Sequence, residues 1–294
     1  MNHEPSRTVL VTGASSGIGR ATVSALLQHG FSVWAATRTE EAATDLRSRF
    51  SGRIRAVAFD LTDLAEVQRA AARVTAAGPL FGLVNNAGAA LPGPLEYVSI
   101  DQFQRQLDVN LTGQLRVTQA LLPALRAGTG VYGTARILMM GSLDGRVVGP
   151  LFGPYAASKH ALVGLSDALR SELHPARIRV TLLEPGVIDT PIWRRGLAVL
   201  SEVQASLPGR GGPYRSIMNF AQRHVLSITS HGASPDRVAQ AVVHSLTQPR
   251  PSPRRVVGTD AILTAVLLHV FPPRLVYRLT ALPRVGSARH DNLV

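Results

Sequence analysis

Short apolar or β-branched runs alternate with longer amphipathic segments along most of this 294-residue chain. The runs lack a polar face, as expected for strands buried on both sides, and the segments between them are long enough for crossover helices. This alternation predicts an α/β fold: a single domain, 1–294, in which helices wind over both faces of a mostly parallel seven-stranded sheet. The expected strands are Thr8–Thr12, Phe31–Thr37, Ile54–Phe59, Phe81–Asn85, Arg136–Gly141, Ile178–Glu184 and Arg255–Gly258. The expected helices are Gly19–Gly30, Leu64–Ala76, Asp101–Leu125, Tyr155–His174 and one from Ser234-Pro235 to about Leu246.

The composition excludes several classes of function. The chain has no cysteine, which excludes disulfides and thiolate metal sites, and its nine histidines show no metal-ligand spacing, so we expect no metal. The formal net charge is +12, but the arginines are scattered and aromatic residues make up 5% of the chain. This pattern favours a basic, solvated surface over nucleic-acid binding. The polar start leads directly into the first strand and leaves no room for a secretory signal, so we expect a cytoplasmic protein.

A glycine-rich turn follows the first expected strand and opens into the first helix. Glycines at such a turn allow the backbone to approach a pyrophosphate closely, and the helix N-terminus stabilises its negative charge. The turn, Thr12-Gly13-Ala14-Ser15-Ser16-Gly17-Ile18-Gly19, therefore predicts a dinucleotide site. The expected contacts at this turn are Gly13, Ser15, Ser16, Gly17, Ile18 and Gly19.

The chain carries 31 basic side chains, and Lys159 is the only lysine among them. It follows Tyr155 by four residues, so the two side chains project from the same face of the expected helix. Ser142 stands thirteen residues before Tyr155, just beyond the fifth expected strand. Tyr155 and Lys159 alone also fit an ordinary surface pair; Ser142 gains its weight from the family resemblance described below, which implies a proton-transfer site.

Reduction of a carbonyl explains these residue types. Hydride transfer develops negative charge on the oxygen, so a donor must deliver a proton there. A free tyrosine has a pKa of about 10, and a nearby cation lowers it. Arginine is effectively always protonated, whereas the ammonium of Lys159 can also give up a proton.

These motifs resemble the short-chain dehydrogenase/reductase family, in the branch with TGxxxGxG and YxxxK motifs. The segment Asn85-Asn86-Ala87-Gly88, at the end of the fourth expected strand, belongs to the same resemblance, which runs from Thr8 to about Gly258. The resemblance implies a Rossmann fold and hydride transfer between a nicotinamide and a carbonyl or alcohol.

The resemblance also implies roles for four residues. Tyr155 would be the general acid/base, and Lys159 would lower the pKa of Tyr155 and hold the nicotinamide ribose. Ser142 would polarise the substrate oxygen. Asn110 matches the family asparagine that kinks the long helix and holds a relay water through its backbone and side chain; the alternative is a solvent-facing amide.

In this family the end of the second strand selects the cofactor. A carboxylate there holds the ribose hydroxyl of NAD(H), whereas a guanidinium favours the extra phosphate of NADP(H). Here neutral Thr37 is followed by Arg38, so we expect NADP(H), with NAD(H) as the alternative. Asp60 would bind the adenine amino group, although it also fits an N-cap or turn aspartate. Further implied contacts are Leu61, Asn86, Ala87 and Gly88 toward the adenosine, Pro185, Gly186, Ile188 and Thr190 toward the nicotinamide, and Tyr155 and Lys159 at its ribose.

A Pro/Gly-rich insertion at 190–233 occupies the position that covers the substrate in this family. The chain beyond Val256 resembles the hydroxysteroid and retinol dehydrogenase-like members, which implies a lipophilic ketone or aldehyde of steroid, retinoid or fatty type. Apolar residues that could line the pocket or simply pack are Leu143, Val148, Leu151, Phe152, Trp193, Leu197 and Met218; the expected substrate contacts are Ser142, Leu143, Phe152, Tyr155 and Trp193.

The tail 259–294 is apolar and rich in arginine. It could lie on the inner face of a membrane as an amphipathic anchor, but we favour packing on the sheet edge or in a dimer. We expect a homodimer or homotetramer. Two other functions stay open: a non-catalytic nucleotide-sensing or scaffold protein, and a sugar-nucleotide epimerase or dehydratase.

Overall fold

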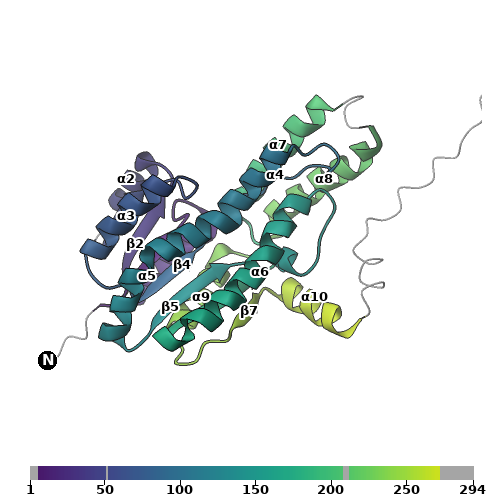
Figure 1. The fold of residues 1–294 in the computed structure, drawn as a ribbon. Helices are drawn as coiled ribbons and strands as arrows, with labels where there is room; N and C mark the ends of the chain where they lie inside the picture. The colour runs from purple at the N-terminus through teal and green to yellow at the C-terminus, as the bar shows by residue number, and fades with distance from the viewer. Residues whose placement is uncertain (1–5, 51, 208–211, 272–294) are drawn as a thin grey trace, which may run out of the picture.

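Seven parallel strands form one sheet within the described part of the computed structural model, which comprises residues 6–50, 52–207 and 212–271 (Figure 1). Their order is β3-β2-β1-β4-β5-β6-β7, so the chain reverses its direction of winding between β1 and β4. This arrangement confirms the predicted α/β fold. The strands are β1 Thr8–Thr12, β2 Ser32–Thr37, β3 Ile54–Ala58, β4 Gly82–Asn85, β5 Ala135–Met140, β6 Ile178–Pro185 and β7 Arg254–Val257.

Helices cover both faces of the sheet. Helices α1, α2 and α9 pack on one face, and α3, α5 and α6 pack on the other. The helices are α1 Gly17–Gln28, α2 Glu40–Arg49, α3 Leu64–Ala76, α4 Ile100–Leu107, α5 Gly113–Tyr132, α6 Gly153–Leu173, α7 Pro191–Ser206, α8 Arg215–His231, α9 Pro235–Thr247 and α10 Thr259–Val270. Shorter segments are the π-helical η1 Asp108–Thr112 and the 3₁₀ turns η2 Leu143–Gly145, η3 His174–Ala176 and η5 Gly212–Tyr214.

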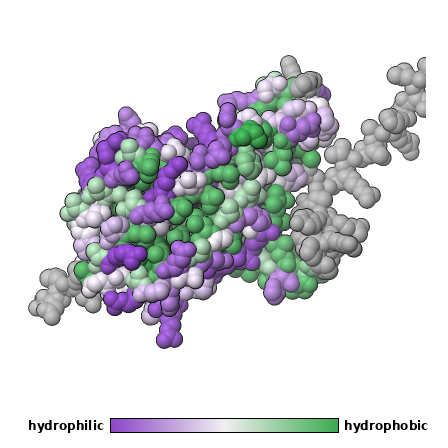
Figure 2. Space-filling view, in the orientation of Figure 1, coloured by the Kyte–Doolittle hydropathy of each residue, from purple (hydrophilic) through white to green (hydrophobic). Residues whose placement is uncertain are grey.

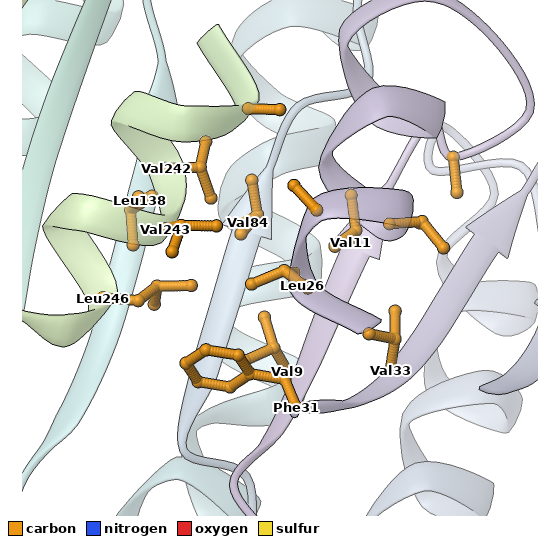
Figure 3. Close-up of a cluster of buried hydrophobic side chains, with 14 of the residues drawn as sticks. Val9, Val11, Leu26, Phe31, Val33, Val84, Leu138, Val242, Val243 and Leu246 are labelled. Atoms are coloured by element: carbon orange, nitrogen blue, oxygen red, sulfur yellow. The ribbon is translucent and has the colours of Figure 1, made fainter. Parts of the chain in front are cut away.

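The alternation of side chains along each strand supplies two cores. Val9 and Val11 of β1 face α1 and α9, and Figure 3 shows Leu26 of α1 next to Val9. Leu10, between them, faces the core beneath α3, α5 and α6. Fully burying one such aliphatic side chain contributes about 1.5–3 kcal/mol, so the sheet is held from both sides.

Two elements differ from the prediction. Helix α2 was not expected, because only Ala43 and Leu46 in its ten residues are buried and the apolar stripe is correspondingly faint. The long helix expected over Asp101–Leu125 is divided into α4 and α5 by the π-helical η1, which contains Asn110, the residue expected to kink it. A π-helical turn contains an extra residue and changes the direction in which the following side chains point.

The insertion expected at 190–233 forms α7, η5 and α8, which project from one end of the sheet (Figure 1). Its two ends meet: Asp189 N–H donates to Ala233 O (3.0 Å) and Ala233 N–H donates to Val187 O (3.0 Å). The insertion has a small apolar core of its own, formed by Leu151, Leu200, Leu207, Met218 and Ala221.

Helix α10 is the described part of the predicted tail; residues 272–294 lie outside the described residues. Asp260 Oδ2 accepts a hydrogen bond from Val187 N–H (2.9 Å), which joins α10 to the segment after β6. Ala261 is buried, but Leu263 is 62% and Val266 52% exposed, so packing on the sheet edge does not cover this helix. Figure 2 shows hydrophobic surface at its position. Among the described residues, no helix has the length and apolar character needed to cross a membrane.

Candidate active site

A cavity of about 890 Å³ runs along the carboxyl edge of the sheet. Residues at or just beyond the ends of six strands, from β1 to β6, line it together with residues of α4, α6 and α7. Ligands of open α/β sheets bind at this edge, beside the point where the strand order reverses. The fold therefore places the sequence motifs in one cavity.

At two positions of the glycine turn, any side chain would collide with neighbouring backbone. Gly13 has a φ of +65°, and a Cβ there would lie 2.9 Å from Ala87 Cα. A Cβ on Gly19 would lie 2.1 Å from Gly13 O, so helix α1 can pack on the turn only because Gly19 has no side chain. Gly19 therefore supports the turn from behind and does not line the cavity, unlike the other predicted turn contacts.

The N-terminus of α1 suits an anionic group. Its first turn contains no acidic residue, and the side chain of its N-cap residue, Ser16, makes no capping hydrogen bond in the described chain. The first N–H groups of a helix have no intrahelical partner and carry partial positive charge. The turn thus fits the pyrophosphate of a dinucleotide.

Thr12 and Asn86 join the ends of β1 and β4. Thr12 Oγ1 accepts hydrogen bonds from Asn86 N–H (2.9 Å) and Ala87 N–H (3.0 Å). Asn86 Nδ2 donates to Thr12 O (2.9 Å). These contacts fix the floor of the cavity at the point where the strand order reverses.

Three buried amides hold the segment after β4. They are spaced four residues apart on α4, η1 and α5, so they lie on one side. Gln106 Oε1 accepts from Leu91 N–H (2.7 Å), Asn110 Oδ1 accepts from Ala89 N–H (2.9 Å), and Gln114 Nε2 donates to Ala87 O (3.0 Å). The sequence analysis missed Gln106 and Gln114, although their spacing around Asn110 was visible.

The side chain of Asn110 differs from its predicted role. It is fully buried and does not line the cavity. Its Nδ2 donates to Ala89 O (3.0 Å) and to Ser158 Oγ (3.0 Å), so both of its hydrogens are already bound to protein groups. Ser158 Oγ in turn donates to Tyr155 O (2.6 Å). Asn110 therefore positions α6 relative to the segment after β4.

The adenosine end of the cavity contains no carboxylate at the end of β2. Thr37 is buried and donates to Thr39 O (2.9 Å), and Arg38 lines the cavity. Arg105 of α4, which the sequence analysis missed, lines the same end. Both guanidiniums line this end and act on the charge of Asp60, so two cations are available to a phosphate group there.

Asp60 is a turn aspartate that also lines this end of the cavity. Its Oδ1 accepts from Thr62 N–H (2.8 Å) and Thr62 Oγ1 (2.7 Å). Burial raises its pKa, but the Thr62 hydrogen bonds outweigh that cost and leave the pKa below its ordinary value. The charges of Arg38 and Arg105 lower the pKa further. Asp60 is thus a carboxylate near neutral pH.

Ser142, Tyr155 and Lys159 line the middle of the cavity together. All three are buried, Tyr155 and Lys159 in the first turns of α6 and Ser142 at the start of η2. Lys159 Nζ donates to Met140 O (2.7 Å) and lies 5.5 Å from the centre of the Tyr155 ring. The predicted triad is therefore assembled in space.

The pKa of Tyr155 corrects one expectation. Lys159 was expected to lower it, but burial raises the pKa of the Tyr155 hydroxyl above its ordinary value, and the negative charge of Asp144 adds to the increase. Ser142 opposes the change only in part. Burial also lowers the pKa of Lys159 to about 8, so its ammonium loses a proton more readily than that of an exposed lysine.

Asp144 was missed by the sequence analysis. Ser142 Oγ donates to Asp144 Oδ2 (3.0 Å) and accepts from Asp144 N–H (3.1 Å). Nothing in a Ser-Leu-Asp-Gly sequence indicates that the aspartate would lie near Tyr155 and Lys159, because those contacts depend on how η2 packs against α6.

A buried ion-pair network anchors the η2 turn to the sheet. Glu184 of β6 is fully buried and binds Arg146 (Oε2 to Nη2, 2.6 Å) and Arg254 of β7 (Oε1 to Nη2, 2.5 Å). Burial raises the pKa of Glu184, but hydrogen bonds from the two guanidiniums outweigh it and leave the pKa below its ordinary value. The network fixes the turn that carries Ser142 and Asp144.

The nicotinamide end begins at the segment after β6. Thr190 packs against the glycine turn, since a Cβ on Gly17 would lie 3.1 Å from Thr190 Cγ2. Trp193 Nε1 donates to Ile188 O (2.9 Å), and the Trp193 ring meets Phe152 edge to face at 6.0 Å. Trp193 lines the cavity, as predicted.

Of the expected substrate contacts, Ser142, Tyr155 and Trp193 line the cavity, whereas several of the apolar candidates pack elsewhere. Met218 and Leu151 belong to the core of the insertion. Leu143, Val148, Phe152 and Leu197 do not line the cavity either. Apolar side chains that do line its wall are Ala90, Leu91, Val109, Ile192, Trp193 and Val199.

The cavity thus brings most of the sequence-predicted site together. Of the predicted residues, Asn110, Gly19, Leu143 and Phe152 lie outside its wall. In the described part of the chain, no group of three or more acidic or histidine side chains could hold a metal ion. The predicted residues in the wall are Gly13, Ser15, Ser16, Gly17, Ile18, Arg38, Asp60, Leu61, Asn86, Ala87, Gly88, Ser142, Tyr155, Lys159, Pro185, Gly186, Ile188, Thr190 and Trp193.

Comparison with known proteins gives the same picture. The family model of the short chain dehydrogenases matches residues 7–197. The chain is 30% identical to an NADPH-dependent 3-dehydrocapnine reductase of Ornithobacterium rhinotracheale, over 93% of this chain and 95% of that protein. It is 36% identical to human retinol dehydrogenase 5, over 91% of this chain and 86% of that protein. A Burkholderia cenocepacia short chain dehydrogenase solved in complex with NADP has a TM-score of 0.73 and 25% identity, covering 95% and 98% of the two chains.

We predict that Glu184→Gln lowers the free energy of unfolding by about 3 kcal/mol at pH 7, because it leaves two guanidiniums without their buried carboxylate. The folded pKa of Glu184 lies below the ordinary 4.5. Its contribution is therefore complete above pH 4.5 and is lost as the pH falls through the folded value. Urea unfolding at several pH values measures this.

The control is Glu40→Gln, which removes the same charge from an exposed pair with Arg47 on α2. It is expected to change stability by less than about 0.5 kcal/mol. Equal effects of the two substitutions, or a difference that does not shrink in acid, would show that the network around Glu184 does not hold the turn.

Proposed function

Because the chain belongs to the short-chain dehydrogenase/reductase family, we propose that it is an NADP(H)-dependent oxidoreductase acting on a carbonyl or alcohol group. The observation that carries the proposal is the arrangement of Ser142, Tyr155 and Lys159 in the same cavity as the glycine turn and Arg38. A protein that only binds nucleotide has no need for a buried tyrosine, serine and lysine in this arrangement. An epimerase or dehydratase would suit a larger substrate domain and a different glycine spacing.

The cofactor would lie along the carboxyl edge of the sheet. Gly13, Ser15 and the N-terminus of α1 would hold the pyrophosphate, and Asp60 the adenine amino group through its free Oδ2. Arg38, with Arg105 nearby, would bind the phosphate that distinguishes NADP(H). A related reductase is named for its NADPH dependence and a similar structure holds NADP, which supports this choice over NAD(H).

The chain's own residues would handle the proton. The bound nicotinamide supplies or accepts the hydride. Tyr155 donates its hydroxyl hydrogen to the carbonyl oxygen in reduction, and its raised pKa keeps it protonated at neutral pH for that step. Lys159, with a pKa of about 8, can return a proton to Tyr155 near neutral pH.

A lipophilic ketone or aldehyde is the proposed substrate. Leu91, Ile192, Trp193 and Val199 supply an apolar wall at the reactive end. The similarity to a retinol dehydrogenase supports this class. We propose that the insertion 190–233 covers the substrate, since α7 contributes Ile192, Trp193 and Val199 to the wall. The homodimer or homotetramer and the membrane contact of the tail stay predictions.

We predict that Tyr155→Phe lowers kcat for carbonyl reduction by about 10² to 10⁴-fold, the range for loss of a positioned general acid. NADPH binding, measured by fluorescence, is expected to persist because the ring and the cavity remain. Tyr132→Phe is the control: its hydroxyl bonds Ser6 O at the other end of the sheet and should be dispensable. Full activity of Tyr155→Phe would refute the assignment.

We expect Lys159→Arg to lose most of the turnover while the variant stays folded. Arginine keeps a positive charge but cannot release a proton, and its planar fork does not fit the short bond to Met140 O (2.7 Å). Steady-state kinetics with NADPH and a panel of steroid, retinoid and long-chain carbonyls measures this. Activity near that of the wild type would mean that charge alone suffices.

The Arg38→Ala variant is expected to weaken NADPH binding by about tenfold or more, the loss of one charge-assisted hydrogen bond, and to leave NADH binding unchanged. Arg20→Ala removes an equal charge from α1, outside the cavity wall, and is expected to bind NADPH normally. The cofactor assignment fails if NADPH affinity is unchanged in Arg38→Ala, or if the wild type binds NADH more tightly.

A further inference from the structure

Asp144 is the one carboxylate that contacts the catalytic serine in the described structure. It accepts the hydroxyl hydrogen of Ser142 (Oγ to Oδ2, 3.0 Å) and returns a backbone N–H to the same oxygen (3.1 Å). A serine hydroxyl has one hydrogen and two lone pairs. While Asp144 is ionised and no substrate is bound, the hydroxyl hydrogen of Ser142 is therefore held by the carboxylate, and the backbone N–H of Asp144 occupies one of its lone pairs.

The turn that carries this carboxylate packs against α6 at the cation of the site: a Cβ on Gly145, next to Asp144, would lie 3.1 Å from Lys159 O. The negative charge of Asp144 raises the pKa of Lys159, against the larger effect of burial, and raises the pKa of Tyr155. Burial raises the pKa of Asp144 itself, and hydrogen bonding from Ser142 and the charge of Lys159 oppose this.

The other charges around η2 are accounted for. Helix α6 packs against η2 and presents Tyr155, Lys159 and His160, of which His160 also lowers the pKa of Asp144. Strand β6 presents Glu184, whose two oxygens are bound by Arg146 and Arg254. Glu184 is thus already paired, and Asp144 is the carboxylate that acts on Lys159.

We propose that Asp144 is a positioning residue of the proton-transfer centre: its carboxylate orients the Ser142 hydroxyl and supplies the counter-charge of the Lys159 ammonium. The Ser142 hydroxyl is thereby held in place beside Tyr155, which donates its own hydrogen to the substrate oxygen. The catalytic consequence rests on the proposed function, whereas the electrostatic coupling to Lys159 does not.

The single lysine makes this coupling directly measurable. Protein labelled with ¹³C-lysine gives one Cε signal, from Lys159, whose titration is expected near pH 8 in the wild type. Asp144→Asn keeps the shape and removes the charge, so the midpoint is expected to fall by about 1 pH unit. A midpoint within 0.2 pH units of the wild type, roughly the scatter of such a titration against the ~1 unit expected, would overturn the proposal.

The matched control is Asp167→Asn. Asp167 lies on the same helix, twelve residues beyond Tyr155, and pairs with Arg170 at the surface. It changes the net charge equally and is expected to leave the Lys159 midpoint in place. The shift caused by Asp144→Asn is expected to persist in a His160→Gln background; its loss there would assign the effect to the imidazole. Asp144→Ser provides the same test if the asparagine variant does not fold.

A kinetic measurement tests the effect on Tyr155. Removing the charge of Asp144 lowers the pKa of Tyr155, so the rise of kcat/KM with pH in alcohol oxidation with NADP is expected to move to lower pH. An unmoved profile in an active enzyme would overturn the role toward Tyr155. If the wild type oxidises no alcohol and reduces no carbonyl, the proposed function fails, and the lysine titration still decides the role of Asp144.

Discussion

The cavity depends on the contact between the end of β1 and the segment that follows β4. Parallel strands end with backbone groups that need partners, and Thr12 and Asn86 supply these to each other across the point where the strand order reverses. The contact is close because Gly13 and Gly19 have no side chains: a Cβ at Gly19 would lie 2.1 Å from Gly13 O. Because the two strand ends are joined in this way, the N-terminus of α1 is held in a fixed position relative to the floor of the cavity.

A set of buried amides connects this floor to the helix that carries Tyr155 and Lys159. The segment after β4 is held by Gln106, Asn110 and Gln114. Asn110 also donates a hydrogen bond to Ser158 of α6, which joins that helix to the segment. Buried amides are costly unless their hydrogen bonds are made, so Gln106 and Asn110, whose donors and acceptors are paired, select one position for the segment that they bind. Tyr155 thus lies in the cavity because α6 is tied to the floor, and Asn110 acts on the chemistry without touching the substrate site.

The sequence predicted the sheet well and the polar contacts poorly, for physical reasons. Strands buried on both faces must be apolar throughout, so β1 matches its prediction and each of the others differs by one residue at one or both ends. The spacing of apolar side chains does not show whether they line a pocket or pack in a core, and Met218, for which both were open, packs inside the insertion. The partners of Asp144 and Asn110 come from segments far along the chain, and local patterns do not contain them.

Burial also changes what the lone lysine does. Lys159 was expected to lower the pKa of Tyr155 and to be able to give up a proton; the apolar surroundings lower the pKa of Lys159 to about 8, which favours proton release, and raise that of Tyr155. Near neutral pH the pair is then a protonated phenol beside an ammonium that can release its proton. Arginine in the same position would stay charged and leave the phenol without a proton source. The reason for one lysine among 31 basic residues is therefore its ability to titrate in a buried site, and Asp144 adjusts the pH at which it does so.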